Sequence, residues 1–382
     1  AGILRPHRGQ TIRRMQGQRL VLCVHDGTDL DYTGLAQCAG LGVIGTHQTG
    51  AQSRGLHLHS TLAVTPEGLP LGVLRAACTA PVPKPPEDAR PTPAIPIAKK
   101  ETFGWIQAHR DCVAVAAAMP QTRLCSVMDR EADFFELFDE PRRHPRVDLL
   151  VRAQYDRRVS GEPRKLFAAV RQAPVAARVQ VPVPRQSARP KRAKQHARPQ
   201  RAARTATLAV RYRAVQLRPP PAHRDKAPIA LWILHAVEEH PPPGAVPVEW
   251  FLLTTLPLAA PEDAIQCLRW YCRRWRIEDW HRVLKSGCRV EALAHETAER
   301  LRRAIAINLV IAWRIMLMTL LGREMPDLPA EVLFSDLEFH VLRAYAKKNA
   351  CRPPRDWARP CGWSPGWGAT WAGPRIRPRA TK

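Results

Sequence analysis

The chain has 382 residues, which at roughly 100–200 residues per domain predicts two or three structural units. Hydrophobic residues make up 45% and charged residues 24%, both ordinary for a globular protein with a core. The charge balance is unusual, because 59 Lys and Arg against 34 Asp and Glu leave a formal net charge of +25. This excess indicates a polyanionic partner, nucleic acid first, and argues against an acidic cytosolic enzyme for small neutral metabolites.

The cysteines and the apolar runs indicate the compartment. The ten Cys form no CxxC pair and no zinc-finger spacing with His, so we expect a reducing, intracellular protein without a structural metal. The longest apolar run, residues 304–321, is interrupted by Asn308 and Arg314 and has no second run beside it. This pattern favours a buried helix over a membrane span. The sequence has no recognisable signal peptide and no initiator Met, and we expect its true N-terminus to lie further upstream.

The first part of the chain predicts a mixed α/β layer. Apolar and alternating runs predict strands at 20–26, 56–65, 70–78, 123–128 and 147–153, and helices at 101–118 and 131–140. The strands at 56–65 and 70–78 form a hairpin, and a Pro-rich surface loop is expected over 81–97. The order strand, hairpin, helix, strand, helix is typical of a mixed sheet covered by helices.

The second part begins with an interruption of this order over residues 155–249. The β-like runs are at 175–183, 205–217 and 229–237, and the segment 185–204 carries eight Arg or Lys and no acid. A strand at 250–256 then precedes three helices, at 261–286 with Pro261 at its first position, at 295–322 and at 331–346. The residues after 348 lack aliphatic periodicity, which indicates either a disordered basic tail or out-of-frame coding.

Four polar side chains share one stripe of the long predicted helix. Tyr271, Arg274, Glu278 and Lys285 stand at relative positions 0, 3, 7 and 14. At about 100° per residue, these positions fall within a sector of roughly 60°. A carboxylate among cations suits a site where a phosphate meets a divalent ion. The alternative is a solvated face held by ion pairs, for example between Arg274 and Glu278.

Two aspartates add to this pattern. Asp26 and Asp129 each close an apolar strand, where Asp is disfavoured, so each is either a turn initiator or a functional residue. Together with Glu278 they would supply the oxygen ligands of a two-metal site for phosphoryl transfer. In such a site one ion activates the attacking oxygen and the other stabilises the leaving oxygen.

Separate segments carry a family resemblance. They are VHDGTDLDYTG around Asp26, VMDREADFFELF around Asp129, WFLLTTLP at Trp250 and YCRRWRIEDWHRVLKSG at 271–287. In this order they closely resemble the IS4-family DDE transposases, the group that includes the Tn5 transposase. The DREAD box of the family corresponds to residues 129–133. The family's helix signature Y-(2)-R-(3)-E-(6)-K is matched by the four residues of the stripe described above.

The resemblance covers about residues 20–348 and implies an α/β fold. The implied architecture is an RNase H-like mixed-sheet core with a mostly β insertion before the Glu-bearing helix, followed by C-terminal helices. The implied segments are a partial N-terminal segment at 1–19, the first part of the core at 20–154, a β-rich basic insertion at 155–249, completion of the core at 250–348, and an irregular or disordered tail at 349–382.

The resemblance also implies residue roles. Asp26, Asp129 and Glu278 would be the catalytic triad that binds two Mg²⁺ ions, with Mn²⁺ as a possible substitute. The expected DNA-binding residues are Tyr271, Arg274 and Lys285 at phosphates, Trp250 stacked on a flipped base, and Arg152 near the DNA end. For Trp250 and Arg152 a purely structural role is the alternative. The remaining candidates, Asp29, Asp31, Asp133, His57 and His59, are interpreted as turn, supporting or structural residues.

The implied function is DNA transposition. The reaction is metal-dependent cleavage at transposon ends, followed by attack of the freed 3′-OH on the opposite strand or on target DNA. The implied partners are double-stranded DNA and a second copy of the chain, with no membrane, in the bacterial cytoplasm at the nucleoid. Relatives carry a DNA-binding domain ahead of the first Asp, and only 25 residues precede Asp26 here, which indicates N-terminal truncation. The alternative function is a catalytically incompetent remnant that only binds DNA.

Overall fold

The computed structural model describes residues 2–46, 51–82, 95–183 and 202–348, together with residues 185, 188 and 200. Most of the basic segment predicted at 185–204 lies outside the described residues. The tail after residue 348 and most of the Pro-rich loop at 81–97 lie outside them as well.

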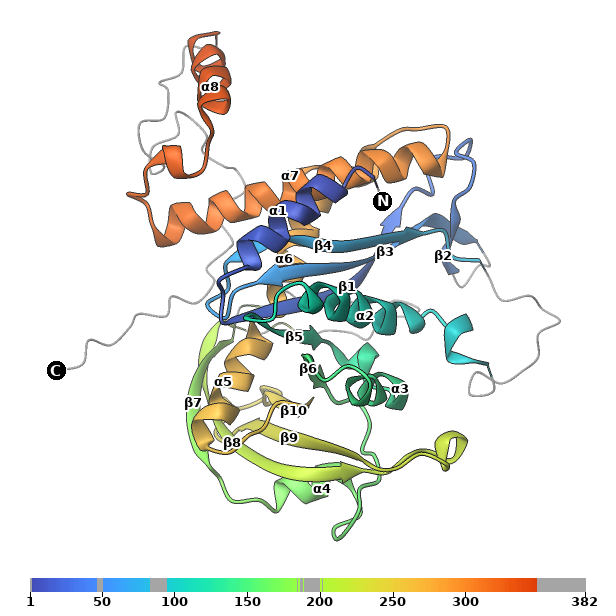
Figure 1. The fold of residues 1–382 in the computed structure, drawn as a ribbon, viewed down its shortest axis with the longest axis vertical. Helices are drawn as coiled ribbons and strands as arrows, with labels where there is room; N and C mark the ends of the chain where they lie inside the picture. The colour runs from blue at the N-terminus through green and yellow to red at the C-terminus, as the bar shows by residue number, and fades with distance from the viewer. Residues whose placement is uncertain are drawn as a thin grey trace.

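One mixed sheet organises the described part of the chain (Figure 1). Its strands are β1 (Leu20–Asp31), β2 (Gly42–Thr46), β3 (Gln52–Val64), β4 (Pro70–Thr79), β5 (Arg123–Met128), β6 (Val147–Arg152), β7 (Ala177–Val183), β8 (Arg204–Leu217), β9 (Ile229–Glu238) and β10 (Glu249–Thr254). The strand order is β2-β3-β1-β5-β6-β10-β9-β8-β7, with β4 also beside β3. β3 is antiparallel to both β1 and β4, whereas β5 runs parallel to β1 and β6 runs parallel to β5. This arrangement is RNase H-like and confirms the predicted α/β fold class.

The inserted strands continue this same sheet. β10 pairs with β6 on one side and with β9 on the other, both antiparallel. β8 and β7 follow at the far edge. The β character expected at 155–249 is therefore present, and these strands are an extension of the sheet that carries the candidate site.

Two strand predictions require correction. The strand expected to end at Asp26 continues to Asp31, because β3 pairs with it along its whole second half. Residues 42–46, which lie outside the predicted strands, form β2 against the first residues of β3. Asp26 therefore lies inside a strand rather than at its end.

Helices cover both faces of the sheet. They are α1 (Arg5–Met15), α2 (Phe103–Ala117), α3 (Phe135–Asp139), α4 (Leu166–Arg171), α5 (Pro261–Cys272), α6 (Trp275–Arg282), α7 (Ala298–Glu324) and α8 (Asp336–Lys348), with a π-helical turn η6 (Val283–Gly287) after α6. Figure 1 shows α2 and α7 on opposite sides of the sheet. In β1, Leu22 and Val24 join the core under α6 and α7, whereas Val21 and Cys23 pack with α2. This period of two fixes the face toward which each β1 side chain points.

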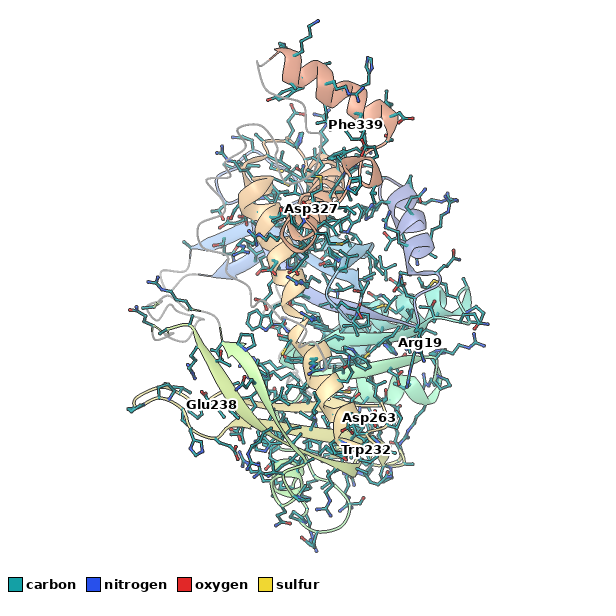
Figure 2. The ribbon with its side chains drawn as sticks, turned by 90° about the vertical axis from the view of Figure 1, so that its left-hand side faces the viewer. Arg19, Trp232, Glu238, Asp263, Asp327 and Phe339 are labelled. Carbon is teal, nitrogen blue, oxygen red and sulfur yellow. The ribbon has the colours of Figure 1, made fainter. Side chains whose placement is uncertain are left out.

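The long helix predicted at 261–286 is not continuous. α5 ends at Cys272 and α6 starts at Trp275, and the chain then widens into the π-helical turn after Arg282. Figure 2 shows α5 and α6 one after the other across the sheet, with Asp263 at the start of α5. α5 packs against β7 and β8, whereas α6 packs against β1 and β3. Because a sheet twists from strand to strand, one straight helix would not follow both regions.

α7 is the described helix that is long and apolar enough, by length and composition, to cross a membrane. It packs against β4 and α6, and the Trp313 indole N–H donates to the Pro70 carbonyl at 2.9 Å. Leu301, Ile305 and Leu309 join the core, while Ile307 on the other side is exposed. These contacts agree with the predicted packing helix.

Trp280 packs α6 against α7. Its side chain is fully buried, and its indole N–H donates to the Leu309 carbonyl at 3.2 Å. We expect Trp280→Ala to lower the free energy of unfolding by about 3–5 kcal/mol, because it leaves a large cavity. Urea denaturation followed by circular dichroism measures this loss. The control is Trp275→Ala on the exposed side of the same helix, and equal losses in the two variants would contradict the docking role of Trp280.

Candidate active site

Two parallel strands place Asp26 and Asp129 side by side. β1 and β5 pair with Val24 opposite Val127, and each Asp follows two residues later. Side chains two residues apart share a face of a strand, and both valines belong to the core under α6. Both aspartates therefore lie toward the α6 side of the sheet. In agreement, the negative charge of Asp129 acts on Asp26 and raises its pKa.

Asp129 also begins a short helical turn. Its Oδ1 accepts a hydrogen bond from the Glu131 N–H at 2.8 Å, at the start of the 3₁₀ turn Arg130–Ala132. Asp129 can therefore be both a turn initiator and a functional residue. One carboxylate oxygen caps the turn, and the side chain remains on the same face as Asp26.

α6 adds a third carboxylate and a cation. The Arg274 guanidinium forms an ion pair with Glu278, and its Nη1 lies 4.0 Å from Asp26 Oδ2. The Arg274 side chain is only 8% exposed, compared with 40% for Glu278. A buried positive charge therefore lies between the carboxylates of β1 and α6.

Burial governs the protonation of this group. Burial raises the pKa of Asp26 to about 7, and the charges of Glu278 and Asp129 act in the same direction. Arg274 and the Gly27 N–H, which donates to Asp26 Oδ1 at 3.0 Å, act against this rise. Burial also opposes the charge of Arg274, but Tyr271, Glu278 and Asp26 together raise its pKa, so it remains charged. The acids are thus short of positive charge even with Arg274 between them.

The donor types fit a hard divalent cation. Three carboxylates from three separate elements offer oxygen ligands, which Mg²⁺ and Mn²⁺ prefer. As placed, no three Asp, Glu, His or Cys side chains among the described residues are grouped so that they could hold a metal. The Arg274 guanidinium contacts both Asp26 and Glu278. A metal ion bound by both acids requires this side chain to turn away.

The structure adds two residues that the sequence did not single out. His281 follows Glu278 by about one helical turn, and its Nδ1 lies 3.9 Å from Asp26 Oδ2. Its Nε2 lies 2.9 Å from the hydroxyl of Ser60, the residue opposite Asp26 in the β1–β3 pairing. Burial, with a smaller effect of Lys285, lowers the pKa of His281 to about 3, so the ring is neutral at pH 7. The spacing of three residues from Glu278 was the available signal for His281.

Three of the expected DNA-binding residues lie together near the end of α5. The rings of Trp250 and Tyr271 meet edge to face, with centroids 6.0 Å apart. Arg152 pairs with Leu252 across β6 and β10, and its charge acts on the Tyr271 hydroxyl. Burial raises the pKa of Tyr271. Tyr271 also interacts with Arg274, so it lies between the half-buried Trp250 and the Arg274 side chain.

Lys285 stands apart from this group. It lies in the π-helical turn, where its ammonium donates to the Asp29 carbonyl and lies 3.4 Å from Glu291 Oε1. The single stripe expected on one straight helix is therefore wrong in its geometry. Arg274 joins the acids, Tyr271 joins Trp250, and Lys285 contacts β1 and the turn beyond η6.

Asp133 braces the segment that carries Arg152. Its Oδ2 accepts hydrogen bonds from the Gln154 and Tyr155 N–H groups at 2.7 and 2.9 Å, and its Oδ1 accepts one from Arg157 Nε at 2.9 Å. The other non-catalytic candidates also have partners, since Asp31 binds Thr33, Asp29 binds His57, and His59 binds Arg75. These contacts are those of supporting residues.

A comparison with protein families connects this geometry to a known group. Residues 144–314 match the family model described as a transposase DDE domain. The match to the DDE domain includes Glu278, the rest of its helix signature, Trp250 and Arg152, while Asp26 and Asp129 precede the matched region. The match supports similarity to the DDE transposases and does not single out the narrower IS4 group.

The contribution of the Asp133 contacts to the free energy of unfolding can be measured. The Asp133 side chain is fully buried and Arg157 is 20% exposed, so Asp133→Ala leaves an arginine without its partner. We expect a loss of about 3–5 kcal/mol in the free energy of unfolding, measured by urea denaturation. The control is Glu162→Ala, which breaks an exposed pair with Arg164 and should cost less than about 1 kcal/mol. A loss from Asp133→Ala as small as the control would exclude the brace.

Proposed function

We propose that the chain is an IS4-family DDE transposase, a metal-dependent DNA nuclease and strand transferase. The observation that carries this proposal is the position of Asp26 and Asp129 on one face of an RNase H-like sheet, with Glu278 of α6 linked to Asp26 through Arg274. The match to a transposase DDE domain and the net charge of +25 support it.

We assign the three acids as ligands of two divalent ions, Mg²⁺ or Mn²⁺. When bound, such ions activate the attacking oxygen and stabilise the leaving oxygen. The protein's part is to hold the carboxylates on rigid elements, with Asp26 and Asp129 on paired strands and Glu278 on a docked helix. Arg274 neutralises Asp26 and Glu278 beforehand, and on turning away it becomes a cation for a DNA phosphate.

The proposed reaction has two displacement steps. In the first, a water oxygen bonds to phosphorus and the P–O3′ bond breaks, which leaves a 5′-phosphate. The water gives up a proton to solvent, and the departing 3′-oxygen takes up a proton from solvent and becomes a 3′-OH. In the second, the 3′-oxygen bonds to a phosphorus of the opposite strand or of target DNA, and the P–O3′ bond there breaks. Neither step needs a covalent bond to the protein.

The group near the end of α5 is proposed to hold the DNA end. The Trp250 ring offers a surface on which a base can stack after it leaves the duplex, and Tyr271 fixes the edge of that ring. Arg152 and Lys285 would supply positive charges for DNA phosphates near the stacked base. We propose residues 20–154 and 250–348 as the core and 155–249 as an insertion that lengthens its sheet. The family resemblance supports a homodimer on paired DNA ends in the cytoplasm.

Glu278→Gln tests the triad. The amide keeps the size of the side chain but removes a charged ligand, so we expect cleavage to fall by at least about 100-fold. The substrate is a labelled duplex carrying the terminal inverted repeat that flanks the coding sequence, with Mg²⁺ and then Mn²⁺. DNA binding, followed by gel shift, should persist.

The matched control is Glu299→Gln, which changes an exposed glutamate paired with Arg303 on α7. It should cleave as the wild type does. Binding of the duplex by the wild type without cleavage in either metal would instead support the DNA-binding remnant.

Lys285→Gln tests the phosphate contacts. Loss of one phosphate contact should lower affinity for unrelated duplexes equally and reduce the slope of log K against log salt by about 1. Fluorescence anisotropy at several salt concentrations measures this slope. Lys226→Gln, which removes a lysine bound to Asp139 instead, is the control and should leave the slope unchanged. An unchanged slope for Lys285→Gln would remove that residue from the interface.

A further inference from the structure

We propose that His281 and Ser60 are positioning residues that orient the Asp26 carboxylate for metal binding. This inference rests on the proposed function, because it concerns the same triad. Neither residue belongs to the helix signature or to the acids, and both are buried.

Ser60 is fixed by the sheet. It lies directly opposite Asp26 in the antiparallel pairing of β1 and β3, and its hydroxyl donates to the Asp26 carbonyl at 3.5 Å. The same hydroxyl is hydrogen bonded to His281 Nε2 at 2.9 Å. This contact fixes the position of the imidazole ring against β3.

The ring also faces the carboxylate. His281 Nδ1 lies 3.9 Å from Asp26 Oδ2, and Arg274 Nη1 lies 4.0 Å from the same oxygen. Oδ1 accepts a hydrogen bond from the Gly27 N–H. The two oxygens of Asp26 thus have separate neighbours that restrain the carboxylate.

The same pair joins the two halves of the site. His281 lies on α6, the helix that carries Glu278, while Ser60 lies on β3 beside Asp26. Their hydrogen bond, between residues 221 positions apart, fixes α6 against the strand that carries Asp26. Residues that orient metal-binding carboxylates typically change metal affinity by 10–100-fold when removed.

The chain offers a matched control on the other face of the sheet. His109 of α2 and Ser126 of β5 form an equally buried pair, with Nδ1 3.0 Å from the hydroxyl. It links a helix to a core strand in the same way but faces none of the three acids. Substitution there should lower stability without changing metal affinity.

The experiment is a titration of the full chain with Mn²⁺ without DNA, with free Mn²⁺ followed by electron paramagnetic resonance. We expect His281→Ala and Ser60→Ala to weaken Mn²⁺ binding by about tenfold or more. His281→Gln, which keeps a donor for Ser60, should recover part of the loss. His109→Ala and Ser126→Ala should bind as the wild type does, and urea denaturation checks that each variant is folded.

Three outcomes would overturn the inference. The first is wild-type Mn²⁺ affinity in both His281→Ala and Ser60→Ala, and the second is an equal loss in the His109 and Ser126 variants. In either case the proposed function stands if Asp26→Asn abolishes Mn²⁺ binding. The third is that Asp26→Asn binds Mn²⁺ as the wild type does, or that the wild type binds none, and this overturns the proposed function as well.

Discussion

The parallel pairing of β1 with β5 is the constraint on which the candidate site depends. It sets Val24 opposite Val127, and the two aspartates follow at equal distances on the same face. A slip of one residue would send one carboxylate to the α2 face, since side chains alternate along a strand. The apolar core under α6 opposes such a slip, because it would move buried valines to the wrong side. The position of the acids is thus determined by hydrophobic packing rather than by their own contacts.

The charges around Asp26 and Glu278 add a second constraint on the candidate site. Burial raises the pKa of Asp26, and the negative charges of Glu278 and Asp129 act in the same direction. Arg274 offsets this negative charge, because it stands four residues before Glu278 at the start of α6 and lies near Asp26.

Local patterns predicted much of the fold, and long-range contacts account for the rest. β5 was predicted at its observed residues, because a short apolar run closed by Asp is a local signal. The end of β1 and all of β2 depend on pairing with β3, and the break before α6 depends on the twist of the sheet. The three acids were found through motifs and the family resemblance. The His281–Ser60 pair was not, because a contact between residues 221 positions apart leaves no local pattern.

The bond between Trp280 and Leu309 has a consequence for synthesis. A growing chain can pair β1 with β5 as soon as both have left the ribosome, but α6 has no complete docking surface until α7 follows. Domains fold as their residues emerge, so the glutamate reaches the aspartates only late in translation. A product that stops before α7 would carry all three acids and still lack the assembled site. On the proposed function, incomplete chains would therefore lack nuclease activity.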